Sequence, residues 1–264
     1  MVKSILAFCL GVVGLVFAQT SAAQTPETLI RTSQYIFEGA VEKQHASNVA
    51  LLPPSDRTVV VRVNNMLRAP KGMNFHGKEI TLYLPRAGEA RTGEVAVFFA
   101  NGWLYGENLA MKQVGRLPIS SAQDLKSTIA QVESKVADEA LLLRMREADL
   151  VVQGKVMATK VMRGEEHKRS EHETDWAVAQ VRVVAVLKGQ VPDTAKTVPV
   201  YFPTSTDEFW YLSPKFSEGQ EGTFILSAAT ARRYRLEGYT ALDPLDFLTG
   251  KDSERAKALA QRLR

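Results

Sequence analysis

The feature that most constrains this chain is an internal repeat, because two stretches of the sequence carry the same pattern in the same order. The first stretch runs from about residue 35 to 115 and the second from about 149 to 245. Both open with two apolar residues, an acid or amide, and a glycine, which is Gly39 in one stretch and Gly154 in the other. Each stretch is long enough to close a core of its own. The sequence therefore predicts two copies of one small domain.

Three further matches follow the first glycine in both stretches. Residues 61–68 match 181–188, residues 80–85 match 198–203, and residues 93–99 match 219–225. These segments are short, rich in β-branched and aromatic residues, and alternate apolar with polar positions, as half-buried strands do. Pro85 and Pro203 end the third segment, since proline cannot donate to a strand ladder. A fifth strand is expected over 108–114 in the first copy and over 235–242 in the second.

Five short strands in about 85 residues, with a glycine where the first strand must bend, are typical of a small closed barrel of the OB type. An immunoglobulin-like sandwich is the alternative, but it would need about seven strands and a Cys or Trp core pattern. Residues 121–148 have apolar positions at helical spacing, and Pro26 lies where a shorter helix would start. The sequence therefore predicts a helix before each barrel. The predicted fold class is mainly β with helices (α+β): two tandem small OB-like β-barrels, each preceded by a helix.

The first 23 residues are typical of a secretory signal peptide. Lys3 supplies the positive start, residues 5–17 are apolar, and small residues precede a cleavage site ahead of Gln24. The apolar run is short for a membrane span, although a retained anchor is the alternative. We therefore expect a periplasmic or secreted protein with no stable membrane span after signal cleavage. The single cysteine, Cys9, lies in this segment, so the mature chain has neither disulfides nor thiolate metal sites.

The predicted organisation has five parts. They are a signal peptide over 1–23, a first OB-like domain over 24–120, a connecting helix over 121–148, a second OB-like domain over 149–250 and a C-terminal helix over 251–264.

Three segments of the second copy carry a family resemblance. They are ADLVVQGKV (148–156), the LKG that ends the second predicted strand (187–189), and FSEGQ (216–220). In these segments the chain resembles the netrin-like, TIMP-like OB-fold class of exported bacterial proteins, and the first copy matches less well. The resemblance implies an OB barrel. Inhibitory members of that class present an N-terminal cysteine to a protease's zinc, and the mature chain has no cysteine, so that chemistry is not implied here.

Two groups of aromatic residues are the candidate binding residues. Phe209, Trp210 and Tyr211 lie between the third and fourth predicted strands of the second copy, and Trp103 and Tyr105 lie in the turn after the fourth strand of the first. Adjacent exposed aromatic residues often mark a contact surface. Alternatively, these side chains gain more from burial, as a plug for a barrel end or a seat for the connecting helix.

Other candidate sites are weaker. His167 and His172 lie among glutamates and could ligate zinc, but the segment from Met162 to Asp175 is nearly all charged, as solvated loops are. The basic run from Arg232 to Arg235 suits a solvated hairpin better than nucleic-acid binding, since 33 basic residues nearly balance 29 acidic ones. Neither a nucleophile elbow, a phosphate loop, a dinucleotide fingerprint nor a zincin helix occurs in the sequence.

These observations predict an exported, non-enzymatic binding or assembly protein. It would present the loops of two OB-like barrels to a protein or glycan partner of the cell envelope or extracellular space, with no cofactor and no nucleic acid. The alternative is a metal-dependent hydrolase that uses the His167 and His172 loop. The sequence does not identify the partner or the oligomeric state.

Overall fold

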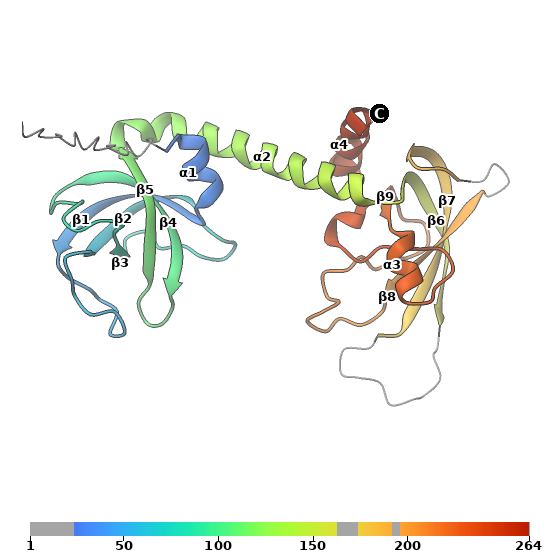
Figure 1. Ribbon diagram of the computed structural model, residues 1–264, viewed down its shortest axis with the longest axis horizontal. Helices are drawn as coiled ribbons and strands as arrows, with labels where there is room; N and C mark the ends of the chain where they lie inside the picture. Colours follow the sequence, from blue (N-terminus) through green and yellow to red (C-terminus); the bar gives the residue numbers. More distant parts are fainter. Residues whose placement is uncertain (1–23, 163–173, 192–195, 264) are drawn as a thin grey trace, which may run out of the picture. The chain divides into compact units, whose positions relative to one another are not determined.

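The structure is a computed structural model that describes residues 24–162, 174–191 and 196–263 (Figure 1). Its described part is mainly β with a few helices, as predicted. The chain divides into two compact units, and the boundary falls between Ala130 and Gln131, inside helix α2 (Ala122–Glu147). The two units are therefore described one at a time.

The first unit contains a closed five-stranded barrel. In chain order its elements are α1 (Pro26–Thr32), β1 (Tyr35–Gln44), β2 (Thr58–Arg68), β3 (Glu79–Tyr83), β4 (Val95–Leu104), β5 (Ala110–Pro118) and the short 3₁₀ helix η1 (Ile119–Ser121). The strands close in the order β1-β2-β3-β5-β4, and only the β3–β5 pair is parallel. Apolar side chains that alternate along each strand fill the interior, where Phe37 and Phe98 stack with ring centroids 5.6 Å apart.

The second unit contains a six-stranded sheet. Its elements after α2 are β6 (Leu150–Met162), β7 (Trp176–Lys188), β8 (Thr197–Pro203), β9 (Glu221–Leu226), α3 (Ala228–Arg233), β10 (Tyr239–Thr240), η2 (Pro244–Asp246), β11 (Phe247–Leu248), α4 (Gly250–Ala260) and η3 (Gln261–Leu263). The strand order is β10-β8-β7-β6-β9-β11, and β10 runs parallel to β8. One isolated antiparallel bridge, Ser227 to Thr240, links the end of β9 to β10. The sheet thus curves as a half-barrel around the core led by Phe224 and Phe216.

Strand register shows that the sequence repeat is also a structural repeat from β1 to β4 and from β6 to β9. The bulges between paired strands fall at matching positions: after Ile36, Glu38 and Val41 in the first unit, and after Val151, Gln153 and Val156 in the second. A bulge bends its strand and increases the local twist. The two sheets therefore curve at the same three places.

Gly39 and Gly154 occupy equivalent sites at one of these bulges. A Cβ on Gly39 would lie 2.7 Å from Val61 Cγ1, and a Cβ on Gly154 would lie 2.7 Å from Val181 Cγ1. In both units the neighbouring strand also presents a backbone carbonyl oxygen within 2.9 Å of that position. Only glycine permits so close an approach of the two strands. The predicted bend in the first strand is confirmed in both units.

The fifth strand of the second copy was predicted wrongly. Residues 235–242 supply only the two-residue strand β10, and Arg232 and Arg233, expected in a hairpin, lie in helix α3. The Ser227 hydroxyl accepts a hydrogen bond from Thr230 N at the start of this helix, and the sequence AATARR that follows favours helix. After the helix the chain makes a turn, in which Leu236 N donates to the Ala231 carbonyl at 2.9 Å and Arg235 has a positive φ, so a strand begins only at Tyr239.

The predicted helices are present. The Thr25 hydroxyl caps α1 by accepting a hydrogen bond from Thr28 N, and α2 and α4 lie where their apolar spacing places them. In α2 the side chains of Leu125, Ile129 and Val132 are buried, whereas Val136, the next apolar residue at helical spacing, is exposed. Among the described residues, no helix has both the length and the apolar character that crossing a membrane requires.

Candidate contact surface in the second unit

The candidate site is the turn formed by residues 207–212, here called the aromatic turn, in the segment between β8 and β9. Asp207 organises it: one carboxylate oxygen accepts hydrogen bonds from Phe209 N (2.9 Å) and Trp210 N (3.2 Å), and the other accepts one from the Ser205 hydroxyl (3.0 Å). Tyr211 N also donates to the Asp207 carbonyl at 2.9 Å. A carboxylate that satisfies successive backbone N–H groups fixes a turn. The turn is therefore held in one conformation.

Trp210 anchors the aromatic turn to the rest of the unit. Its half-buried ring lies edge-on to Trp176, with centroids 6.0 Å apart, and 6.4 Å from Tyr234, while Trp176 and Tyr234 are 4.9 Å apart. These three rings come from the start of β7, the turn itself and the C-cap of α3. The alternative interpretation of the aromatic run was that its side chains pack inside the protein. This interpretation applies to Trp210.

Lys215 closes the base of the turn. Its ammonium donates a hydrogen bond to the Trp210 carbonyl at 2.9 Å. Burial lowers the pKa of Lys215 below its usual value, and the nearby Asp207 carboxylate opposes that shift. The lysine thus adds a further hydrogen bond between the turn and the chain that follows it.

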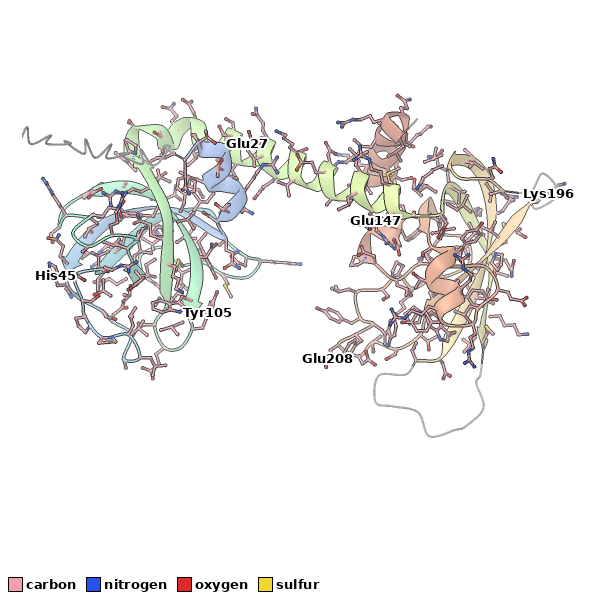
Figure 2. All side chains as sticks on the ribbon, viewed as in Figure 1. Glu27, His45, Tyr105, Glu147, Lys196 and Glu208 are labelled. Carbon is pink, nitrogen blue, oxygen red and sulfur yellow. The ribbon has the colours of Figure 1, made fainter. Side chains whose placement is uncertain are left out.

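The neighbours of Trp210 point to solvent. The side chains of Phe209, Tyr211 and Leu212 are 62%, 60% and 57% exposed. Two aromatic rings and one aliphatic side chain thus project from a fixed turn of six residues. Figure 2 labels Glu208 in this turn, at an end of the second unit distant from α4. Contact surfaces of proteins commonly consist of exposed apolar side chains that cluster on a well-ordered segment.

The aromatic residues predicted in the first unit have different environments. Trp103 belongs to β4, which continues to Leu104, so its predicted place in the following turn is wrong. Its half-buried ring lies 5.2 Å from that of Tyr83, and Lys112 Nζ lies 4.5 Å above it. The lysine contact is of the cation–π kind. Trp103 therefore packs along the barrel wall.

Tyr105 follows β4 and is exposed (Figure 2). Its hydroxyl lies 3.4 Å from that of Tyr35, which donates to Met73 Sδ at 2.9 Å. Burial, together with the hydrogen bond to Tyr105, raises the pKa of Tyr35. Tyr105 also lines a cavity of 730 Å³ with Phe75 and Asn108. It shares this region of the first unit with Trp103 but does not stack on it in any described ring contact.

The predicted metal-binding alternative falls outside the described residues, because His167 and His172 lie in the segment 163–173. Within the described ranges, no group of three or more histidine, cysteine, aspartate or glutamate side chains is arranged to hold a metal ion. The hydrolase interpretation therefore stays a prediction.

Compared with known proteins, the chain matches no protein-family model and no curated sequence. Its function must be argued from the site itself. Sequence reasoning singled out the three consecutive aromatic residues but missed Asp207, Leu212, Trp176 and Tyr234. An aspartate two residues before the aromatic run was the available signal for Asp207, because aspartate commonly caps the backbone two residues ahead of it.

Proposed function

We propose that this protein is an exported, non-enzymatic binding or assembly protein built from two OB-like barrels. The strand order of the first unit and its single parallel pair, β3 with β5, support the OB assignment. The parallel pair β8 with β10 of the second unit supports the same assignment for the second copy. The signal-like first 23 residues support a periplasmic or secreted location.

The exposure of Phe209, Tyr211 and Leu212 on a preformed turn carries the proposal. Ordering a flexible loop on binding opposes association, because each immobilised side chain costs about 0.5–1.5 kcal/mol. The hydrogen bonds of Asp207 and the packing of Trp210 meet part of that cost before any partner arrives. The turn is therefore suited to presenting apolar side chains to a macromolecule.

A protein partner fits this surface better than a glycan. Sugar rings stack on aromatic faces, but they carry hydroxyl groups that an aliphatic side chain such as Leu212 leaves unsatisfied. A mixed patch of Phe, Tyr and Leu is instead matched by an apolar pocket on another protein. We therefore place a protein first and a glycan second.

Photo-crosslinking in the native cell tests the proposal. A photoreactive phenylalanine analogue replaces Tyr211 in one variant and Val184 in the other, and Val184 is an apolar β7 residue that is 70% exposed. We expect one defined crosslinked protein from position 211 and none from position 184. The Phe209→Ala change in the same background should reduce that product. Equal labelling from both positions would reject the turn as a contact surface, and retention on envelope polysaccharide without a crosslinked protein would favour a glycan.

A further inference from the structure

Strand β6 of the second unit extends beyond the strand that pairs with it on one side, β9. The β6–β9 pairing ends at Lys155 and Glu221, and the last backbone hydrogen bonds on this side of β6 are made by Val156. Residues 157–162 of β6 pair only with β7 among the described residues. This stretch, here called the open edge of β6, is exposed at every residue. The sheet is therefore open to a further strand at this place.

The backbone groups of two residues on the open edge, Thr159 and Val161, point away from β7. Residues of a strand bond alternately to the neighbours on its two sides. Val183 N of β7 donates to the Lys196 carbonyl on the β8 side, so the residues of β7 that bond to β6 are 176, 178 and 180, which lie opposite 162, 160 and 158. Thr159 and Val161 thus direct their N–H and C=O groups outward. The backbone of another extended chain pairs with groups of this kind.

The first copy ends the equivalent strand differently. Val41 of β1 corresponds to Val156, because each carbonyl accepts a hydrogen bond from a glycine N–H of the segment before the fourth strand. Beyond Val41, β1 continues only over residues 42–44, which are charged or polar, as in strand edges that are kept from pairing. The open edge of β6 instead carries three large apolar side chains, which are 39%, 55% and 40% exposed: Met157, Val161 and Met162. The apolar extension therefore belongs to the second copy alone.

The open edge lies at the same end of the sheet as the aromatic turn. Met162, the last residue of β6, is opposite Trp176, the first residue of β7, and the ring of Trp176 contacts that of Trp210. The segment that carries the turn leaves β8 at this end, because Pro203, the last residue of β8, is also opposite Trp176. One partner can therefore reach both surfaces.

The side chains of the open edge limit the chemistry of the partner. Residues opposite each other in an antiparallel pair share a face, so Val161 lies on the face of the buried Ala177 and Lys160 lies on the other face. Lys160 is exposed and forms no ion pair in the described part of the chain. A carboxylate on an added strand would pair with it, whereas a second copy of this chain paired about Lys160 would place like charges opposite each other.

We propose that a partner protein adds an extended segment to the open edge of β6. The backbone of this segment bonds to Thr159 and Val161, an aspartate or glutamate of the segment lies beside Lys160, and apolar side chains of the segment lie beside Val161. The inference rests on the proposed function, because it assigns a mode of binding to the same protein partner. The two surfaces have different residues, so each is tested separately.

Photo-crosslinking in the native cell from position 159 tests the proposal, and mass spectrometry then sequences the crosslinked segment. We expect one protein, joined through a single segment in which apolar residues alternate with polar ones and include an aspartate or glutamate. A product from position 211 without one from 159 would overturn strand addition and leave the proposed function intact. A product from position 159 without one from 211 would support strand addition and reject the aromatic turn. A crosslink to a second copy of this chain would also overturn the proposal.

Val161→Pro tests the backbone hydrogen bonds directly. Proline is tolerated where a strand N–H faces solvent, so the melting temperature should change little while the product from position 159 falls about tenfold or more. Val161→Thr keeps the N–H, so the loss with proline should exceed the loss with threonine. Lys160→Glu should lower the product several-fold even where the proline variant fails to fold, and Lys71→Glu, at an exposed lysine of the first unit, is its control. A product that neither Val161→Pro nor Lys160→Glu diminishes would overturn the proposal.

Discussion

Trp210 and its neighbours show how adjacent residues of one type acquire opposite roles. The Asp207 turn directs Trp210 toward Trp176 and Tyr234 and directs Phe209 and Tyr211 outward. We predict that Trp210→Ala lowers the free energy of unfolding by about 2 kcal/mol, because a half-buried ring leaves a partial cavity. The double change Phe209→Ala and Tyr211→Ala should leave it nearly unchanged. Urea unfolding measures both variants, and equal losses would refute the division of roles.

Glycine at the first-strand bulge gives the second prediction at the residue scale. Ala at position 39 or 154 would place a Cβ against a valine methyl and a backbone carbonyl, and the carbonyl cannot move aside cheaply. We expect Gly39→Ala and Gly154→Ala each to cost about 1–3 kcal/mol through overpacking. Gly106→Ala is the control, because its nearest contact would be Asn108 O at 3.9 Å. Thermal unfolding of the three variants compares them directly, and similar melting temperatures would contradict the close-approach argument.

At the scale of elements, an ion pair ties α2 to η2 in the second unit. Arg144 donates two hydrogen bonds to the buried Asp246 carboxylate, at 2.7 and 2.8 Å, and Leu242 N and Asp243 N donate two more. Burial raises the pKa of Asp246 above its ordinary value, and Arg144 opposes that shift. Asp246 thus depends on these donors to stay ionised inside the unit.

We predict that Arg144→Met costs about 3 kcal/mol at neutral pH, because it leaves a buried carboxylate without its cation. Without the guanidinium the folded-state pKa of Asp246 rises further. A carboxyl group with a raised folded pKa is protonated more readily in the folded than in the unfolded state, so stability rises as the pH falls through that folded pKa. The deficit relative to wild type should therefore shrink on acidification, and Asp246→Asn in the same background should recover part of it. Unfolding curves between pH 4 and 8 decide this, and a deficit that is constant with pH would be the contrary result.

For the whole molecule, the distribution of buried clusters bears on independent folding. The barrel core lies between Tyr35 and Met111, and the two clusters of the second unit lie between Leu141 and Ala260. No described cluster includes residues from both sides of the boundary at Ala130. We predict that fragments 24–130 and 122–264 each fold and melt cooperatively. Circular dichroism during heating measures this, and a fragment without a cooperative transition would show that the halves depend on each other.

The sequence was informative where local pattern determines structure. Alternating residues and the glycines at positions 39 and 154 predicted four strands of each copy, and their registers agree. The predicted closure of the second sheet was wrong, because helix α3 and the turn after it leave only the two-residue strand β10 where the repeat would place a full fifth strand. The partners of Trp210 had no sequence signature either: Trp176 and Tyr234 come from separate segments, and only the fold brings them together.

The sheet of the second unit ends on both sides in a strand of two residues, β10 and β11. Sheet edges are where foreign chains add themselves and where fibrils begin, and short edges offer an incoming strand few backbone groups to pair with. Two-residue margins thus let this unit keep an open sheet while discouraging self-polymerisation. Short edges matter particularly in a protein that is expected to work outside the cytoplasm without disulfides. In such a protein no covalent cross-link would restrain a long open edge from pairing with another chain.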